Sequence, residues 1–191
     1  MIDIVEGRCG WCASDDDYIA YHDNEWGRLV TDDNKLFEMV ILEGAQAGLT
    51  WLSILKRREG YRRAFHNFIP EKVAAMTDED VERLMLDKGI IRNRLKIKST
   101  ISNAIAFLKV QKEFGSFFAY ISSFFQEDVP VDNHLETFSG APSSSAESDA
   151  ISKDMKRRGF KFFGTTICYA FLQSCGFVND HLEGCKCRNG Q

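Results

Sequence analysis

The sequence contains little proline, no long apolar run and no excess of positive charge. Only 3 of its 191 residues are proline, which argues against long linkers, and the length suffices for one core or two small lobes. No apolar run approaches the roughly 20 residues that span a membrane. The first twenty residues carry five acidic side chains, so we expect neither a signal peptide nor contact with a membrane.

The net charge of −4 gives no general attraction to nucleic acid, so a nucleic-acid site must be a local basic face. Six cysteines in a chain without a recognisable leader fit reduced thiols or metal ligands better than disulfides.

Cysteine and histidine gather near both ends of the chain. Cys9 and His22 lie in the first segment, and His181 and Cys185 lie in the last. Two thiolates and two imidazoles are a common ligand set for a tetrahedral Zn²⁺. If these four side chains meet, one structural metal joins the two ends of the chain and is worth roughly 10–16 kcal/mol.

The same segments allow other assignments. Cys9 and Cys12 form a C-x-x-C pair, and Cys185 with Cys187 would complete a four-cysteine site. A redox role for the C-x-x-C pair would need a βαβ setting, and no strands are evident. Ordinary buried thiols are a further explanation, and spacing alone does not choose among these.

Apolar residues recur at helical spacing nearly throughout, so we expect an all-α fold without a strand pair. Caps are expected at Asp32 or Asp33, at Thr50, at Thr77 with Asp80, and at Thr165 or Thr166. Pro70 suits the first position of a short helix, and a further helix is expected from about Ser148. Gly44 and Gly48 predict a break between the first two helices. Residues 126–146 are rich in proline, glycine and serine, which indicates an irregular connection.

Residues 77–108 read as helix, tight turn at Gly89 and second helix. Such a helix-hairpin-helix directs backbone N–H groups and a helix N-terminus toward a phosphate, and it binds DNA without reading its sequence. Four cations follow the turn within seven residues: Arg92, Arg94, Lys96 and Lys98. A solvated basic face is the alternative explanation.

All three tryptophans lie in the first 51 residues, with Tyr18 and Tyr21 among them. Aromatic side chains stack on nucleobases, each contact being worth roughly 1–3 kcal/mol, although burial in a core is the commoner reason for such residues. Glu43 stands in an apolar helical run, where an unpaired carboxylate is costly. We therefore expect a partner or a ligand for Glu43.

Several strings of the sequence resemble the DNA-3-methyladenine glycosylase I family of the helix-hairpin-helix glycosylase superfamily. They are residues 8–11, 18–27, 42–51, 89–92 and 158–169, and residues 178–181 with Cys185. The resemblance implies a single, monofunctional glycosylase domain over residues 1–191. It also implies a cytoplasmic bacterial monomer that flips 3-methyladenine out of alkylated double-stranded DNA, hydrolyses its N-glycosidic bond and leaves an abasic site.

The resemblance also implies roles for particular residues. The ligands of the family's structural zinc match Cys9, His22, His181 and Cys185. The base pocket matches Glu43, the expected catalytic or recognition carboxylate, together with Tyr21, Trp51, Trp11 and Trp26. Gln46 and Leu49 match the loop that enters the duplex, and Gly89 and Arg92 belong to the hairpin. Because methylation at N3 makes the base a cation and a good leaving group, we expect recognition to outweigh acid–base catalysis.

The chain departs from the family's enterobacterial pattern at Cys12, Ala45 and Leu95, where valine, glutamine and glycine are expected. Ala45 makes DNA contacts near Gln46 less certain, and Leu95 is expected to change packing only. Many superfamily members use an aspartate beyond the second hairpin helix, and no counterpart is evident among Asp128, Asp132 and Asp149.

Two other functions compete with the glycosylase interpretation. A non-catalytic DNA-binding module would share the zinc and the hairpin but would leave Glu43 unexplained. A zinc hydrolase or deaminase would need an open metal position and an H-x-E…P-C-x-x-C arrangement, which the sequence lacks.

Overall fold

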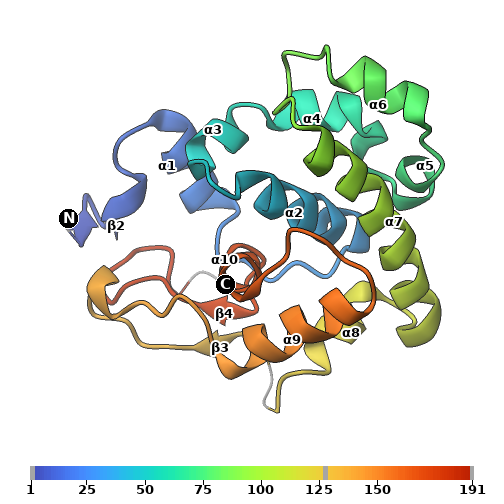
Figure 1. The fold of residues 1–191 in the computed structure, drawn as a ribbon. Coiled ribbons are helices and arrows are strands. Elements are labelled where there is room, and N and C mark those ends of the chain that lie inside the picture. Colours follow the sequence, from blue (N-terminus) through green and yellow to red (C-terminus); the bar gives the residue numbers. More distant parts are fainter. Residues whose placement is uncertain (1–2, 127–128, 190–191) are drawn as a thin grey trace.

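A computed structural model describes residues 3–126 and 129–189 of the chain. As the sequence predicts, the fold is mostly helical (Figure 1). Its α-helices are α1 (Asp16–Asn24), α2 (Asp33–Gln46), α3 (Trp51–Leu55), α4 (Arg58–Ala64), α5 (Pro70–Ala74), α6 (Asp78–Leu84), α7 (Arg94–Phe114), α8 (Phe117–Ser122), α9 (Ala146–Arg157) and α10 (Thr165–Ser174). In these described ranges, no helix is long and apolar enough to cross a bilayer.

Helix α2 lies at the centre in Figure 1, with α3, α4 and α6 above it, α7 descending along its right-hand side, and α8 to α10 below it. It packs against α3, α7, α8 and α10, and every residue from Leu36 to Ala45 is buried. A helix that is apolar on nearly all sides is typical of such a central position. The carboxylate of Glu43 is therefore carried into the interior.

Local capping chemistry explains most helix starts. The side chains of Asp32 and Thr50 accept hydrogen bonds from the N–H groups of Lys35 and Ser53, and Thr77 forms the predicted capping box with Asp80. Helix α5 begins at Pro70. These predictions are confirmed.

Three predicted boundaries are wrong. Helix α9 begins at Ala146 and is capped by Ser145, and Gly164 rather than a threonine caps α10. Gly44 does not break α2, which continues to Gln46. A Cβ on Gly44 would lie 3.0 Å from the carbonyl oxygen of Phe162, so glycine serves a close approach of two segments there.

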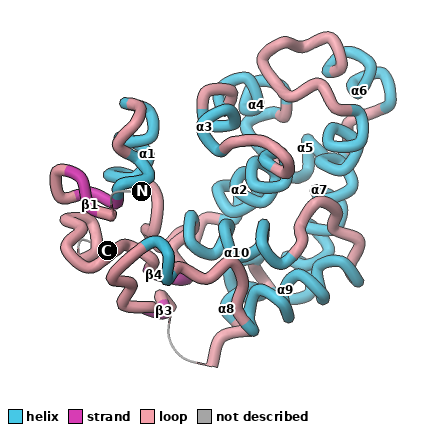
Figure 2. Tube along the Cα trace, turned by 60° about the vertical axis from the view of Figure 1, so that its left-hand side comes forward, coloured by secondary structure: helices cyan, strands magenta, loops and turns pink. Residues whose placement is uncertain are grey.

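Two short strand pairs were not predicted. Strands β1 (Ile4–Val5) and β2 (Arg8–Cys9) are antiparallel, and β3 (Val131–Asp132) and β4 (Val178–Asn179) are parallel. They appear in Figure 2 among the loops near both ends of the chain. Their function is local: β2 ends on Cys9, and β4 leads directly to His181.

Candidate active site and metal centre

The first and last segments meet in a cluster of four buried side chains: Cys9, His22, His181 and Cys185. Their ligand atoms all lie within 4.8 Å of one another. The sulfur of Cys185 is 3.5 Å from both His22 Nε2 and His181 Nδ1, and the sulfur of Cys9 is 3.7 Å from His181 Nδ1. A tetrahedral zinc with bonds of about 2.3 Å to sulfur and 2.05 Å to nitrogen separates such atoms by roughly 3.5 Å.

Hydrogen bonds outside the cluster orient both imidazoles. His181 Nε2 lies 3.1 Å from the carbonyl oxygen of Trp26, and His22 Nδ1 lies 2.8 Å from the carboxylate of Asp23. Since a carbonyl accepts only, Nε2 of His181 carries the proton and Nδ1 turns its lone pair toward the thiols. The carboxylate of Asp23 likewise accepts a hydrogen bond from Nδ1 of His22, so Nε2 of His22 is free to bind a metal.

Asp23 is itself firmly held. Burial would raise the pKa of this carboxyl, but hydrogen bonds from His22, Arg8 and Lys186 hold the pKa well below its usual range. A permanent carboxylate behind His22 makes the imidazole a more basic ligand.

The alternative thiols lie outside the four-residue cluster. The Cys12 thiol donates to the carbonyl oxygen of Cys9 at 3.1 Å, and Cys187 lies near Asp23, at 3.7 Å. Cys187 belongs to a second group of possible metal ligands, together with His22 and Asp23. That group contains a single sulfur, and it shares His22 with the four-residue cluster. The geometry thus favours the two-cysteine, two-histidine set over the four-cysteine set.

An aromatic cavity of about 300 Å³ lies beside the cluster. Trp26 connects the two: its ring centroid is 4.7 Å from that of His181 and 5.1 Å from that of Trp11. Tyr21 and Trp51 lie 5.5 Å apart on the cavity wall. The residues that line the cavity are Trp11, Tyr18, Tyr21, Trp26, Glu43, Gln46, Trp51, Phe138, Ala141, Ala170 and Gln173.

The cavity contains polar atoms that lack partners. Four buried side-chain polar atoms in the described part of the chain make no hydrogen bond, and three of them belong to cavity residues: the Tyr21 hydroxyl, Glu43 Oε2 and Trp51 Nε1. Each such atom costs about 1–3 kcal/mol. Their concentration in one cavity indicates a site built for a polar ligand.

Burial raises the pKa of Glu43 to about 8, and the hydroxyl of Ser174 offsets this in part. The carboxyl is thus mostly protonated at neutral pH when no cation lies beside it. A bound cation would favour its ionised form and lower the pKa again.

Sequence reasoning missed several walls of the cavity. Phe138 and Ala141 come from the irregular connection, which therefore closes one side of the site. Gln173 comes from α10, and its amide donates to Asp180 at 2.7 Å. A polar residue near the end of an otherwise apolar helix was the available signal for Gln173.

The hairpin between α6 and α7 is present, but two of its backbone N–H groups, which were expected to face a phosphate, donate to groups within the protein. The N–H of Gly89 donates to Asp87 at 2.7 Å, and that of Ile91 donates to the Tyr61 hydroxyl at 3.3 Å. A Cβ on Gly60 would lie only 2.1 Å from the carbonyl oxygen of Gly89. Helix α4 therefore supports the turn directly.

Three of the four cations after the turn contact other groups of the protein. Arg94 pairs with Glu82, Lys98 pairs with Asp78, and Lys96 donates to backbone carbonyls of the α2 end. Among residues 3–126 and 129–189, no ion pair is found for Arg92, which is exposed. Lys96 is thus turned toward α2, while the ion pairs of Arg94 and Lys98 lie at the exposed surface. Phosphate binding by Arg92, Arg94 and Lys98 stays a prediction.

The remaining predicted positions are clear in the structure. Gln46 lines the cavity, and Leu49 beyond it is 42% exposed. Leu95 is 70% exposed, so the expectation that it changes packing is wrong. Asp132 pairs with Arg188 and Asp149 accepts from Thr165, neither lines the cavity, and Asp128 lies outside the described residues.

Comparison with known proteins identifies the family. Residues 11–189 match the sequence model for methyladenine glycosylase. This chain belongs to the methyladenine glycosylase family. It is 55% identical over 183 residues to DNA-3-methyladenine glycosylase 1 of Escherichia coli K12, with 96% of this chain and 97% of that protein covered. It is 45% identical over 181 residues to DNA-3-methyladenine glycosylase of Haemophilus influenzae, with 95% and 97% covered.

Solved structures agree with this assignment. A crystal structure of a 3-methyladenine DNA glycosylase I matches this methyladenine glycosylase with a TM-score of 0.91 at 52% identity, covering 95% of this chain and 99% of that one. The enzyme from Staphylococcus aureus, studied for its recognition of 3-methyladenine, matches with a TM-score of 0.91 at 36% identity, covering 95% and 96%.

The raised pKa of Glu43 predicts a pH-dependent effect of Glu43→Gln on stability. Between pH 4.5, the usual pKa of the carboxyl, and about 8, the unfolded chain ionises this group while the folded protein keeps it protonated. Wild type therefore loses stability relative to the variant as pH rises. We expect Glu43→Gln to raise the free energy of unfolding by about 2–4 kcal/mol at pH 8 and by little near pH 4.5.

Urea unfolding at several pH values measures this difference. Glu136→Gln, which changes an exposed carboxylate, is the control and should give a constant difference. If the free energies of unfolding of Glu43→Gln and wild type also differed by the same amount at every pH, the raised pKa of Glu43 would be contradicted.

Proposed function

We propose that this methyladenine glycosylase removes 3-methyladenine from alkylated double-stranded DNA by hydrolysing the N-glycosidic bond after base flipping, and leaves an abasic site. The observation that carries the proposal is the aromatic cavity with three unpartnered buried polar atoms. A flipped base is read by stacking between aromatic side chains and by hydrogen bonds to its edge. The cavity offers both.

In the proposed complex, the faces of Tyr21 and Trp51 stack on the base and attract its positive charge by cation–π interaction. Glu43 is the recognition carboxylate: its free oxygen accepts a hydrogen bond from the amino edge of the base, and its ionised form neutralises the cation. Trp11 and Trp26 close the cavity. Because methylation already makes the base a good leaving group, selective binding of the flipped cation supplies most of the specificity.

We propose two DNA-binding elements, the turn after α2 and the hairpin at Gly89. We propose that Leu49, which is 42% exposed, and Gln46 fill the space that the flipped base leaves. The hairpin at Gly89, with the exposed side chain of Arg92, holds the DNA backbone. A polar groove of about 400 Å³ adjoins Gly89, and its basic lining residues are Lys56, Arg57, Arg63 and Lys88. It would extend the contact with phosphates.

We infer that Cys9, His22, His181 and Cys185 hold one structural zinc. Two thiols and two correctly oriented imidazoles fit this ion. Four protein ligands would leave no position for water, so the metal would stabilise the fold and take no part in hydrolysis. This is why a zinc hydrolase or deaminase is the weaker interpretation. Location in a bacterial cytoplasm and action as a monomer stay predictions.

Chromatography of bases released from methylated DNA tests the activity. We expect wild type to release 3-methyladenine with little 7-methylguanine. We expect Glu43→Gln to lower single-turnover release by about tenfold or more, because the carboxylate no longer compensates the cation, whereas Glu136→Gln should match wild type. Full release by Glu43→Gln would refute the role of this carboxylate. No release by folded, metal-loaded wild type would favour a DNA-binding module.

Metal content and thermal unfolding test the zinc site. Cys185→Ala should lose the bound zinc and melt roughly 10 °C lower, because the ion joins segments from both ends of the chain. Cys187→Ala is the matched control, since this thiol lies next to the cluster without belonging to the set of four. The assignment fails if Cys187→Ala loses the metal and Cys185→Ala retains it.

A further inference from the structure

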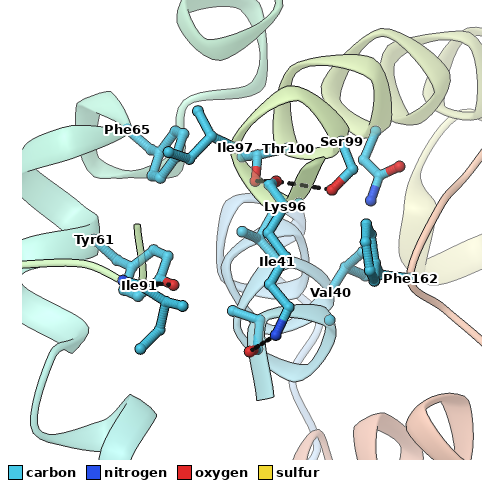
Figure 3. Close-up of a pocket in the computed structure, with 13 residues that line it drawn as sticks. Val40, Ile41, Tyr61, Phe65, Ile91, Lys96, Ile97, Ser99, Thr100 and Phe162 are labelled. Atoms are coloured by element: carbon cyan, nitrogen blue, oxygen red, sulfur yellow. Dashed lines mark hydrogen bonds between the residues drawn. The ribbon is translucent and has the colours of Figure 1, made fainter. Parts of the chain in front are cut away.

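The side chain of Lys96 connects the hairpin to the end of α2. Lys96 lies in the first turn of α7, directly after the hairpin. Its ammonium donates to the carbonyl oxygen of Ala45 at 2.8 Å and to that of Ala47 at 2.7 Å. Figure 3 shows this side chain running past Ile41 toward the end of α2.

The two carbonyl groups are those on either side of Gln46. The last carbonyls of a helix lack partners within the helix, and a cation there also interacts favourably with the helix dipole. At Ala47 the backbone leaves helical geometry, with φ of −46° and ψ of 115°. The N–H of Leu49 then donates to the carbonyl oxygen of Gln46 at 2.6 Å. Lys96 therefore holds the start of the turn that carries both Gln46 and Leu49.

The side chain of Lys96 is half-buried. It lies along a narrow gap of about 10 Å³ whose lining includes Ile41 and Ile97. The contacts of its ammonium are the two hydrogen bonds to the end of α2. A shift of the α7 start would thus be transmitted to the turn through these two hydrogen bonds.

We propose that Lys96 is a positioning residue that couples the hairpin to the turn at residues 46–49. When the hairpin rests on the DNA backbone, Lys96 sets the position of Gln46 and Leu49 against the duplex. Lys96 itself contacts neither phosphate nor base. This inference rests on the proposed function, because it assigns how two DNA-binding elements of that function are kept in register.

The variant Lys96→Met removes the two hydrogen bonds and keeps an unbranched apolar side chain. We expect single-turnover release of 3-methyladenine from duplex DNA to fall about tenfold, with the affinity for free 3-methyladenine, measured by tryptophan fluorescence, within about twofold of wild type. Lys109→Met, which changes an exposed lysine on the same helix, is the control and should leave both quantities unchanged.

A double-mutant cycle separates positioning from a general loss of structure. If Lys96 acts through the turn, Lys96→Met should lower the release rate by less than about threefold when Gln46→Ala is already present. Two results would overturn the proposal. One is an equal loss of release rate with and without Gln46→Ala, and the other is a loss of free-base affinity as large as the loss of release. If Lys96→Met does not fold, Lys96→Gln, which keeps one amide donor, enters the same cycle with the same criterion.

Absence of 3-methyladenine release by wild type would refute the proposed function itself. Failure of the proposed function is therefore distinguishable from failure of the proposal for Lys96.

Discussion

Glu43 is a carboxyl group buried among aromatic rings with one oxygen that bonds to nothing, and the rest of the structure makes this arrangement possible. An isolated buried carboxylate is so costly that it normally takes up a proton, which is the state that its raised pKa describes. The group remains in place because α2 is packed on all sides and cannot turn its polar residue outward. A protein that keeps such a group trades stability for a ligand that can satisfy it.

The metal cluster contributes to the same site from the other side. The carbonyl of Trp26 accepts from His181, while the ring of Trp26 forms part of the cavity wall. Joining the two ends of the chain thus fixes the position of Trp26 as well as the terminal segments. We infer that loss of the proposed zinc would loosen the cavity wall before it unfolded the helical core.

Features that depend on neighbours in sequence were predictable from the sequence. The caps at Asp32, Thr50 and Thr77 follow from local hydrogen bonding, and the burial of Glu43 follows from the apolar run around it. The resemblance to a known family selected the pairs Cys9–His22 and His181–Cys185, which spacing alone left open. The structure then brought these side chains together.

Features that depend on distant segments could not be predicted. Gly44 resembled a helix break because nothing local indicates its contact with Phe162. Lys96 resembled a phosphate ligand because sequence shows that a residue is basic and does not show which way its side chain extends. Phe138 reaches the cavity from a connection with no regular pattern. In each case the deciding partner belongs to another segment of the chain.

We propose that the unpartnered atoms of the cavity form a receptor for a methylated purine. The most direct test is a tryptophan-fluorescence titration of wild type with free 3-methyladenine and with adenine. We expect 3-methyladenine to bind at least about tenfold more tightly than adenine, a difference of roughly 1.4 kcal/mol. Equal affinities for the two bases, or no change in fluorescence with either, would contradict it.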